Sequence, residues 1–513
     1  MTENRQSVIV LIMSALAFTV CFAVWTMNGV LVTFLSDNRI LTLDPVQIGW
    51  LIGIPVLTGA ITRLPVGMLT DRFGGKYVFA GVMLLAAIPA YLMSYANTYT
   101  EFILGSLGFG LAGASFAVGI AYTSVWFKKE HQGTALGIFG AGNAGASLTS
   151  LGAPSLLQHL TNDGANLDGW RTLPQIYAFA LVGMTVLFLL FTRNRKVERA
   201  ANVGMLASLR PLKSVRVWRF GLYYFLVFGG FVALSQWLIP YYVSVYAMSL
   251  VTAGFLATLF SMPSGLIRAI GGWMSDRFGA RAVMYWILAI TLLASLLLIV
   301  PPVNVQTPGQ SVMATDKGTI TAVTESEIVV GETAYPLKSK SATAIPQGES
   351  GLVILPRMTF WQEPTVQVGD QIKRKQLLAQ GVTHVYFPAT VWVFTFLVFL
   401  LGVTTGIGKA AVYKHIAEYF PADMGVVGGL VGVIGALGGF FLPIFWGYLV
   451  GQTGLWSTTW LFFAFLTLVS LTWMHLVIRK MTGRQTARQE RHMDVVSAAE
   501  RVLVSASSGA ADR

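Results

Sequence analysis

The chain contains runs of apolar residues that are long enough to cross a lipid bilayer, and this restricts its fold more than any other feature. About 20 consecutive apolar residues in a helix span the roughly 30 Å hydrocarbon core. Only 11% of the 513 residues are charged, against about 25% in soluble domains. We therefore expect an all-α membrane protein with twelve transmembrane helices, near residues 8–34, 46–70, 77–97, 101–127, 133–157, 172–192, 219–246, 250–275, 281–301, 387–412, 424–450 and 456–478.

Basic residues gather in loops that alternate along the chain, and the formal net charge is +12. Such loops lie in the cytoplasm of membrane proteins. This predicts a multi-pass protein of the inner (plasma) membrane with both termini in the cytoplasm. It also explains the positive charge without nucleic acid, so lipid is an expected partner and nucleic acid is not.

One phrase occurs twice, as "RLPVGMLTDRFGGK" at 63–76 and "RAIGGWMSDRFGAR" at 268–281. Each copy closes the second helix of a set of six, so the chain divides into two similar halves. Two six-helix halves of parallel topology predict a major-facilitator-type transporter, with the substrate bound at mid-membrane between them. The predicted parts are a first half at 1–192, a cytoplasmic loop at 193–218, a second half at 219–301 and 387–478, and a basic cytoplasmic tail at 479–513.

Residues 302–386 interrupt the second half between its third and fourth helices. Alternating stretches such as "GTITAVTESEIVVGETAYPL", punctuated by Gly and Pro, favour short strands. The predicted topology places this segment outside the cell. We expect a β-rich extracellular insert, with a disordered loop as the alternative.

Two arginines, Arg63 and Arg268, lie eight residues before Asp71 and Asp276. Eight helical residues span about 12 Å, which places both arginines near the middle of the bilayer. No predicted helix contains an Asp or Glu at that depth. A buried arginine needs a partner of opposite charge. The sequence therefore predicts that the substrate is an anion and pairs with the two arginines. The alternative is that each arginine binds helix carbonyls and braces the bundle.

Glycines recur in "GIFGAGNAGAS" at 137–147 and in "GGLVGVIGALGGFFLP" at 428–443. Glycine at about four-residue spacing lets helices pack backbone to backbone, and it also leaves room for a small ligand. The helix-packing glycines expected near the substrate are Gly142, Gly145, Gly432 and Gly435. Asn143 is the amide in the first stretch and could donate to an anion.

The repeated phrase resembles the signature of the major facilitator superfamily. Its charged residues imply a gate that must release when the halves move, and the matching residues are Gly67, Asp71, Arg72, Asp276 and Arg277. The two glycine-rich stretches resemble those of that superfamily's nitrate/nitrite porters. This resemblance implies that Arg63, Arg268 and Asn143 bind the anion. It also implies that Phe116, Tyr224 and Phe228 enclose it, with lipid or core packing as the alternative for these three aromatic residues.

The stretch "GIGKAAVYKHIAEYFP" at 406–421 resembles the nitrate/proton symporter branch, with Lys409 as a possible coupling residue. A lysine that snorkels from a helix end is the alternative. The sequence thus predicts a monomeric importer of nitrate coupled to protons, and not an enzyme. A nitrate/nitrite antiporter, a carrier of another small anion and a non-transporting sensor remain open. No metal or cofactor is expected, because the six histidines lack the spacing of metal ligands.

Overall fold

The computed structural model describes residues 2–195, 209–300, 303–340, 357–387, 390–420 and 424–481. The chain separates into two compact units. One comprises Met1–Leu296 with Val398–Arg513, and the other is Leu297–Leu397. The first unit is helical and the second carries all the strands found in the described residues.

The helices of the first half begin and end as follows: α1 (Thr2–Trp25), α2 (Asn28–Asp37), α3 (Pro45–Phe73), α4 (Gly75–Leu92), α5 (Tyr99–Phe109), α6 (Ser115–Ser124), α7 (Lys129–Gly140), α8 (Gly145–Leu160) and α9 (Thr172–Phe191). Those of the second half are α11 (Val215–Tyr224), α12 (Gly230–Tyr246), α13 (Leu250–Leu266), α14 (Arg268–Phe278), α15 (Ala280–Leu298), α17 (Val391–Tyr419) and α18 (Met424–Thr453). A last helical span covers Thr458–Met481. Short 3-10 segments include η1 (Met93–Tyr95), η2 (Gly110–Ala114), η3 (Ala141–Ala144) and η4 (Leu167–Arg171), and η6 (Phe225–Gly229) is a π-helix.

Among the described residues, ten helices are long and apolar enough to cross a membrane, or eleven if the bent pair α13 and α14 forms one span. The predicted number of twelve is therefore not confirmed. The segment at 133–157, which was predicted to be one span, is divided by η3 into α7 and α8. Its many Gly, Ser and Thr residues make it less apolar than the other spans.

Local sequence sets the course of α3, the helix that carries Arg63. Asp44 caps its first turn by accepting a hydrogen bond from the Gln47 backbone at 2.8 Å, and Gly74 ends it at φ +88°. Pro55 cannot donate to the carbonyl of Leu51. The buried amide of Asn28 donates to that carbonyl instead, at 2.6 Å. The carbonyl that the internal proline leaves without a donor is thus satisfied.

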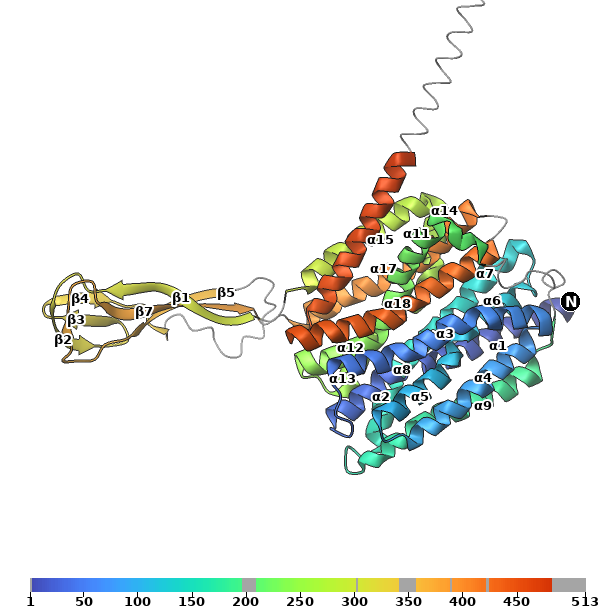
Figure 1. Cartoon of the computed structure of the whole chain (residues 1–513), viewed down its shortest axis with the longest axis horizontal. Coiled ribbons are helices and arrows are strands. Elements are labelled where there is room, and N and C mark those ends of the chain that lie inside the picture. Colours follow the sequence, from blue (N-terminus) through green and yellow to red (C-terminus); the bar gives the residue numbers. More distant parts are fainter. Residues whose placement is uncertain are drawn as a thin grey trace, which may run out of the picture. The chain divides into compact units, whose positions relative to one another are not determined.

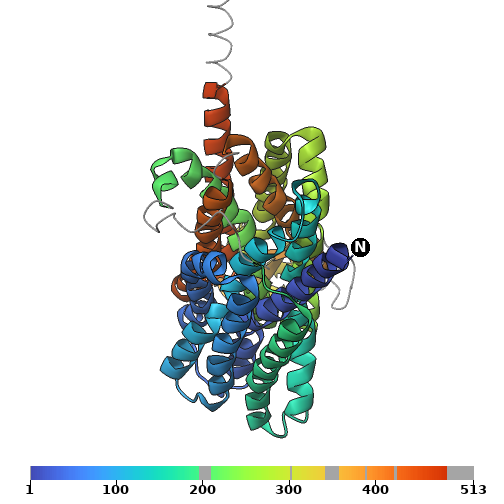
Figure 2. The same ribbon diagram turned by 90° about the vertical axis from the view of Figure 1, so that its right-hand side faces the viewer.

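The two halves lie side by side in the helical unit, as Figure 2 shows nearly along the helices. Helix α3 of the first half packs along α18 of the second, and α8 packs on α13 (Figure 1). These two helix pairs join the halves.

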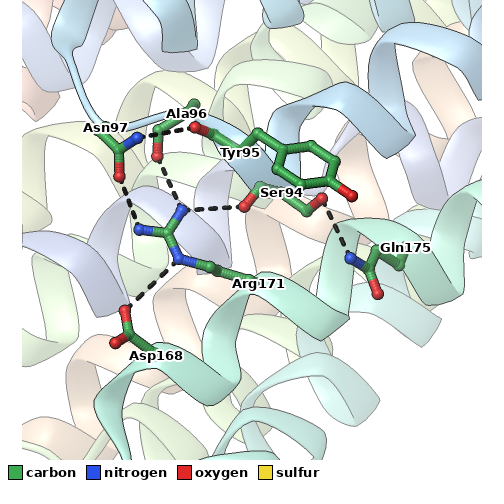
Figure 3. A network of polar contacts seen from close by, with 7 residues as sticks. All are labelled: Ser94, Tyr95, Ala96, Asn97, Asp168, Arg171 and Gln175. Atoms are coloured by element: carbon green, nitrogen blue, oxygen red, sulfur yellow. Dashed lines mark hydrogen bonds and ion pairs between the residues drawn. The ribbon is translucent and has the colours of Figure 1, made fainter.

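Arg171, at the end of η4, joins two connections of the first half (Figure 3). Its guanidinium donates to the carbonyls of Ser94 and Ala96 at 2.9 and 3.2 Å, and to the side chain of Asn97 at 2.7 Å. It also lies 3.5 Å from Asp168, whose side chain is exposed. The hydrogen bonds thus hold η4 against the turn after α4.

We expect Arg171→Met to lower the free energy of unfolding by about 1–3 kcal/mol, because the three hydrogen bonds come from a charged donor. Asp168→Asn should have a much smaller effect, since exposed ion pairs contribute about 0–1 kcal/mol. Thermal unfolding of the detergent-solubilised protein, followed by tryptophan fluorescence, measures both. Arg39→Met, at an exposed loop position, is the control. Equal melting temperatures for Arg171→Met and the wild type would contradict the assignment.

The second unit contains two antiparallel sheets. The strands are β1 (Val303–Met313), β2 (Gly318–Val323), β3 (Glu327–Val330), β4 (Thr333–Pro336), β5 (Arg357–Pro364), β6 (Gln371–Ile372) and β7 (Leu377–Phe387). One sheet has the order β1-β7-β5 and the other β4-β3-β2-β6. A small core that includes Ile320, Ile328 and Leu378 joins them. The sequence prediction of strands in 302–386 thus corresponds to small sheets, and its placement outside the cell stays a prediction.

Candidate functional site

Arg63 is buried in α3, with 5% of its surface exposed. Its Nη1 donates to the carbonyl of Gly432 in α18 at 2.8 Å. Its Nε and Nη2 have no hydrogen-bond partner among the described residues. The expectation that the arginine braces helix carbonyls therefore accounts for one of its donors, and two buried nitrogens are left for another acceptor.

Arg268 is the first residue of α14 and approaches the same place from the second half. The centre of its guanidinium lies 5.9 Å from the centre of the Phe116 ring, and that of Arg63 lies 5.1 Å from the same ring. Its buried Nη1 has no partner among the described residues, which also provide no ion pair for either arginine. Both predicted arginines thus meet at one aromatic ring, with no described carboxylate bound to them.

Aromatic rings enclose the two guanidinium groups. Phe116 and Phe228 lie nearly parallel, with ring centres 6.2 Å apart and an angle of 25°. Tyr224 stacks on Phe228 at 5.0 Å. The π-helix η6 contains Phe228 and follows Tyr224 directly, and such local departures from α-helical geometry are frequent at functional sites. All three aromatic residues named from the sequence therefore belong to this cluster.

Asn143 lies in η3 and is fully buried, and neither atom of its amide has a partner among the described residues. Gly140, three residues earlier, lies against Arg268, because a Cβ there would be 3.3 Å from Nη1. The unpaired amide of Asn143 thus lies in the segment that contacts Arg268.

The four predicted glycines lie at close contacts. A side chain at Gly142 or Gly145 would collide with α1, and one at Gly435 would collide with the Tyr224 ring. A Cβ at Gly432 would lie 3.3 Å from the Tyr413 hydroxyl and 3.8 Å from Nη1 of Arg63. Gly432 therefore lines the site itself, while the other three let helices and rings approach it.

Lys409 does not lie near a helix end. The predicted end at 412 is wrong, because α17 continues to Tyr419. The lysine is fully buried, and its Nζ lies 3.5 Å from the centre of the Phe231 ring with no hydrogen-bond partner among the described residues. The snorkelling alternative is therefore excluded, and a third buried basic side chain lies near the arginines of the site.

The residues of the repeated phrase lie about one to two and a half helical turns beyond the arginines. Asp276 pairs with Lys414 of the same half at 2.6 Å. Asp71 has no ion pair with another described residue. Arg72 and Arg277 are exposed and lie over aromatic rings of their own helices. Within the described residues, no ion pair joins the phrases of the two halves, and Gly67 has open space beside it.

The halves are in close contact at one end of the bundle. A Cβ at Gly49 would lie 2.3 Å from the carbonyl oxygen of Pro443, and one at Gly254 would lie 2.2 Å from that of Ser150. At the other end, a Cβ at Gly137 or Gly429 would meet nothing within 4 Å. The helices of the two halves therefore pack backbone to backbone at the Pro443 end, whereas these two glycine positions at the end that carries the repeated phrases have open space beside them.

Sequence reasoning missed Tyr413 in α17. Its ring centre lies 5.5 Å from the guanidinium of Arg268, and it packs edge-on against Tyr224 at 5.2 Å. The signal was present, because Tyr413 follows Lys409 by four residues and so occupies the same face of the helix. Trp25 was also missed, and its ring centre lies 5.9 Å from the guanidinium of Arg63.

Comparison with known proteins identifies the fold and the superfamily. The model of the Major Facilitator Superfamily matches residues 13–316 and 377–508, and the unmatched stretch lies within the strand-bearing unit. A solved bacterial homologue of the human lysosomal transporter Spinster, in an inward-facing and occupied conformation, superposes with a TM-score of 0.58 and 13% identity. That match covers 91% of this chain and 96% of the other. It shows the same fold.

Among curated relatives, the "Probable nitrate/nitrite antiporter NarK1" of Thermus thermophilus is 40% identical over 487 residues, 94% of each chain. The "Nitrite extrusion protein" of Bacillus subtilis is 24% identical and covers 95% of this chain and 99% of its own. The "Probable nitrate/nitrite transporter NarK2" of Mycobacterium tuberculosis is 32% identical over 58% of this chain and 73% of its own. The chain belongs to the nitrate/nitrite porter family of the Major Facilitator Superfamily and is a multi-pass membrane transporter.

Proposed function

We propose that this protein imports nitrate across the plasma membrane by alternating access, with proton movement coupled to the anion. The observation that carries the proposal is the meeting of Arg63 and Arg268 at the Phe116 ring, with buried guanidinium nitrogens left unpaired. Leaving such charges without an acceptor is costly inside a membrane. A bound anion would provide the acceptor.

The shape of the site supports a small planar anion. A guanidinium is a planar fork of donors that matches a planar oxyanion. Two van der Waals contacts on opposite faces of an anion need a ring separation of about 7 Å. Phe116 and Phe228 are 6.2 Å apart, so their rings would part by about an ångström to admit nitrate between them. Asn143 would add a neutral donor.

The close packing of the halves at the Pro443 end supports an alternating mechanism. With the predicted topology, the end that carries Asp71 and Asp276 faces the cytoplasm, and the conformation described here would be closed to the outside. The positive charges of Arg63 and Arg268 repel one another, and the anion reduces this repulsion. The transporter with anion bound would therefore change between its two open states more readily than the empty transporter.

Coupling is needed because moving a monovalent anion into a negative-inside cell costs about 2.3 kcal/mol per 100 mV. Lys409 is the candidate proton carrier: an anion in the site attracts a proton to its amine, and its departure releases that proton. Exchange of nitrate for nitrite is the second candidate mechanism, and the name of the Thermus relative favours it.

Nitrate flux into vesicles of purified protein tests both mechanisms. Symport predicts that an imposed proton gradient drives accumulation of labelled nitrate in vesicles that contain no other permeant anion. Exchange predicts that flux requires nitrite inside. Competition by phosphate or small carboxylates, as strong as that by unlabelled nitrate, would point to another anion as substrate. Absence of nitrate flux under both conditions would refute the proposed function.

Lys409→Met should lower proton-driven nitrate accumulation by about 5- to 100-fold, the range typical of coupling between two sites. The methionine keeps the length and apolar packing of the side chain and removes the proton-carrying amine. Lys128→Met, at an exposed position before α7, is the matched control. Accumulation by Lys409→Met at the wild-type level, at equal amounts in the membrane, would remove Lys409 from the mechanism.

Deletion of the strand-bearing segment separates transport from a sensor role. Val303 of β1 pairs with Phe387 of β7 in an antiparallel ladder, so the two ends of the segment lie about 5 Å apart. A short Gly-Ser linker can therefore replace 303–387 without stretching the chain. We expect this variant to keep nitrate flux within a few-fold of the wild type. Complete loss of flux in a variant that reaches the membrane would show that the segment is essential for transport.

A further inference from the structure

A second basic pocket lies inside the second half. Four helical spans meet around a narrow cleft that is partly open to solvent. Helices α11, α15 and α17 and the last span contribute residues to it, and Figure 1 shows where these three labelled helices lie. The residues that line it are Arg219, Phe220, Tyr223, Arg281, His415, Tyr419, Met474, Ile478 and Met481. Two of these residues are permanent cations and none is acidic.

Arg219 is the unusual member of the pocket. Only 7% of its surface is exposed, and its Nε is buried without a hydrogen-bond partner among the described residues. The buried hydroxyl of Tyr223, one turn along α11, also lacks a partner there. A buried cation with no acidic neighbour is costly. The pocket thus contains two unsatisfied polar groups that an anion with several oxygens could satisfy.

Arg281 is the second cation of the pocket and lies at its mouth. Arg281, near the start of α15, is exposed and donates to the hydroxyl of Tyr419 at 2.5 Å. The His415 ring lies parallel to that of Tyr419, with an angle of 14° between them, and its Nδ1 donates to the carbonyl of Ala411 at 3.0 Å. These contacts fix the orientation of Tyr419 and hold Arg281 over the opening.

We propose that this pocket binds a phosphate group, which Arg219 holds from inside and Arg281 from the mouth. Arginines pair readily with phosphate through two parallel hydrogen bonds. The three residues from the last span are apolar, so the pocket has one apolar side beside its cations. That combination fits the headgroup and first methylenes of an anionic phospholipid, and free phosphate shares the same recognition chemistry. The site belongs to the second half alone and is separate from the arginines between the halves.

The test uses full-length protein with saturating nitrate, so that the central site is occupied. Inorganic phosphate binding is measured by titration in neutral detergent. Retention of phosphatidylglycerol is measured by native mass spectrometry after reconstitution in phosphatidylcholine nanodiscs that contain it. The variants are Arg219→Gln and the exposed Arg281→Gln, which should fold whatever the first variant does. Lys213→Gln, an exposed lysine just before α11 that does not line the pocket, is the control.

We expect both variants to weaken binding by about 10- to 100-fold, as for loss of a charged hydrogen bond, and the control to match the wild type. Loss in the lipid measurement identifies a headgroup, and loss in the titration with unchanged lipid retention identifies free phosphate. Wild-type affinities for both ligands in Arg281→Gln and in folded Arg219→Gln would overturn the proposal. So would a wild-type protein that binds neither ligand. These results are independent of nitrate flux.

Discussion

Replacing Arg63 or Arg268 with lysine is expected to lower nitrate transport by about 10- to 100-fold for each substitution. Lysine keeps the positive charge and loses the planar fork, so at least one hydrogen bond to the anion disappears, and hydrogen bonds to charged groups contribute about 1.5–3 kcal/mol each. Arg63 also donates to the carbonyl of Gly432, a contact that links α3 to α18. The effect at Arg63 should therefore include a change in how the two halves pack.

Initial rates of labelled nitrate uptake at several concentrations distinguish an effect on anion binding from an effect on the conformational change of the transporter. Loss of anion contacts raises KM, whereas loss of the link between helices lowers the maximal rate as well. Arg39→Lys, at an exposed loop position with the same residue change, is the control for expression and insertion. Full-rate transport by both lysine variants, at normal levels in the membrane, would end the assignment of the two arginines as the anion site.

The positions of the two arginines could be predicted from the sequence because the repeat fixes their depth. Each lies eight residues from an aspartate that ends a span, and both copies keep that distance. Because no predicted span has an Asp or Glu at the depth of the arginines, the sequence then predicted an anionic substrate. The structure adds that both arginines contact the Phe116 ring. Depth along a helix follows from counting residues, but the ring on which two helices converge depends on tertiary packing.

Other features could not be predicted, because a run of apolar residues marks only the part of a helix that faces lipid or the protein core. The full length of the helix can be greater. Helix α17 continues past residue 412 through the more polar residues up to Tyr419, so the buried position of Lys409 was hidden. The π-helix η6 has no composition that separates it from the α-helices on either side. The basic pocket around Arg219 was also missed, since its residues come from four spans and share no motif.

Alanine at Gly49 should block the conformation seen here and reduce nitrate flux by about tenfold or more. The added Cβ would lie 2.3 Å from the carbonyl oxygen of Pro443 and 2.9 Å from its carbon. These are backbone atoms of α18 that cannot move aside as a flexible side chain would. Overpacking of this kind costs about 1–3 kcal/mol, which the protein avoids by separating α3 from α18 at this end. The variant would then remain in the opposite state of the transport cycle.

Thiol labelling measures that shift directly, because the single native cysteine, Cys21, is buried. Gly429→Cys places a reporter on α18 one turn from Gly432, toward the end that carries the repeated phrases, where nothing lies within 4 Å of the new Cβ. Labelling of this cysteine should fall when Gly49→Ala is added, as that end closes. Gly183→Ala, on α9 with open space around its Cβ, is the matched control and should change neither labelling nor flux. Unchanged labelling together with lost flux would mean that Gly49 acts locally, and the two ends of the bundle would then not open and close in alternation.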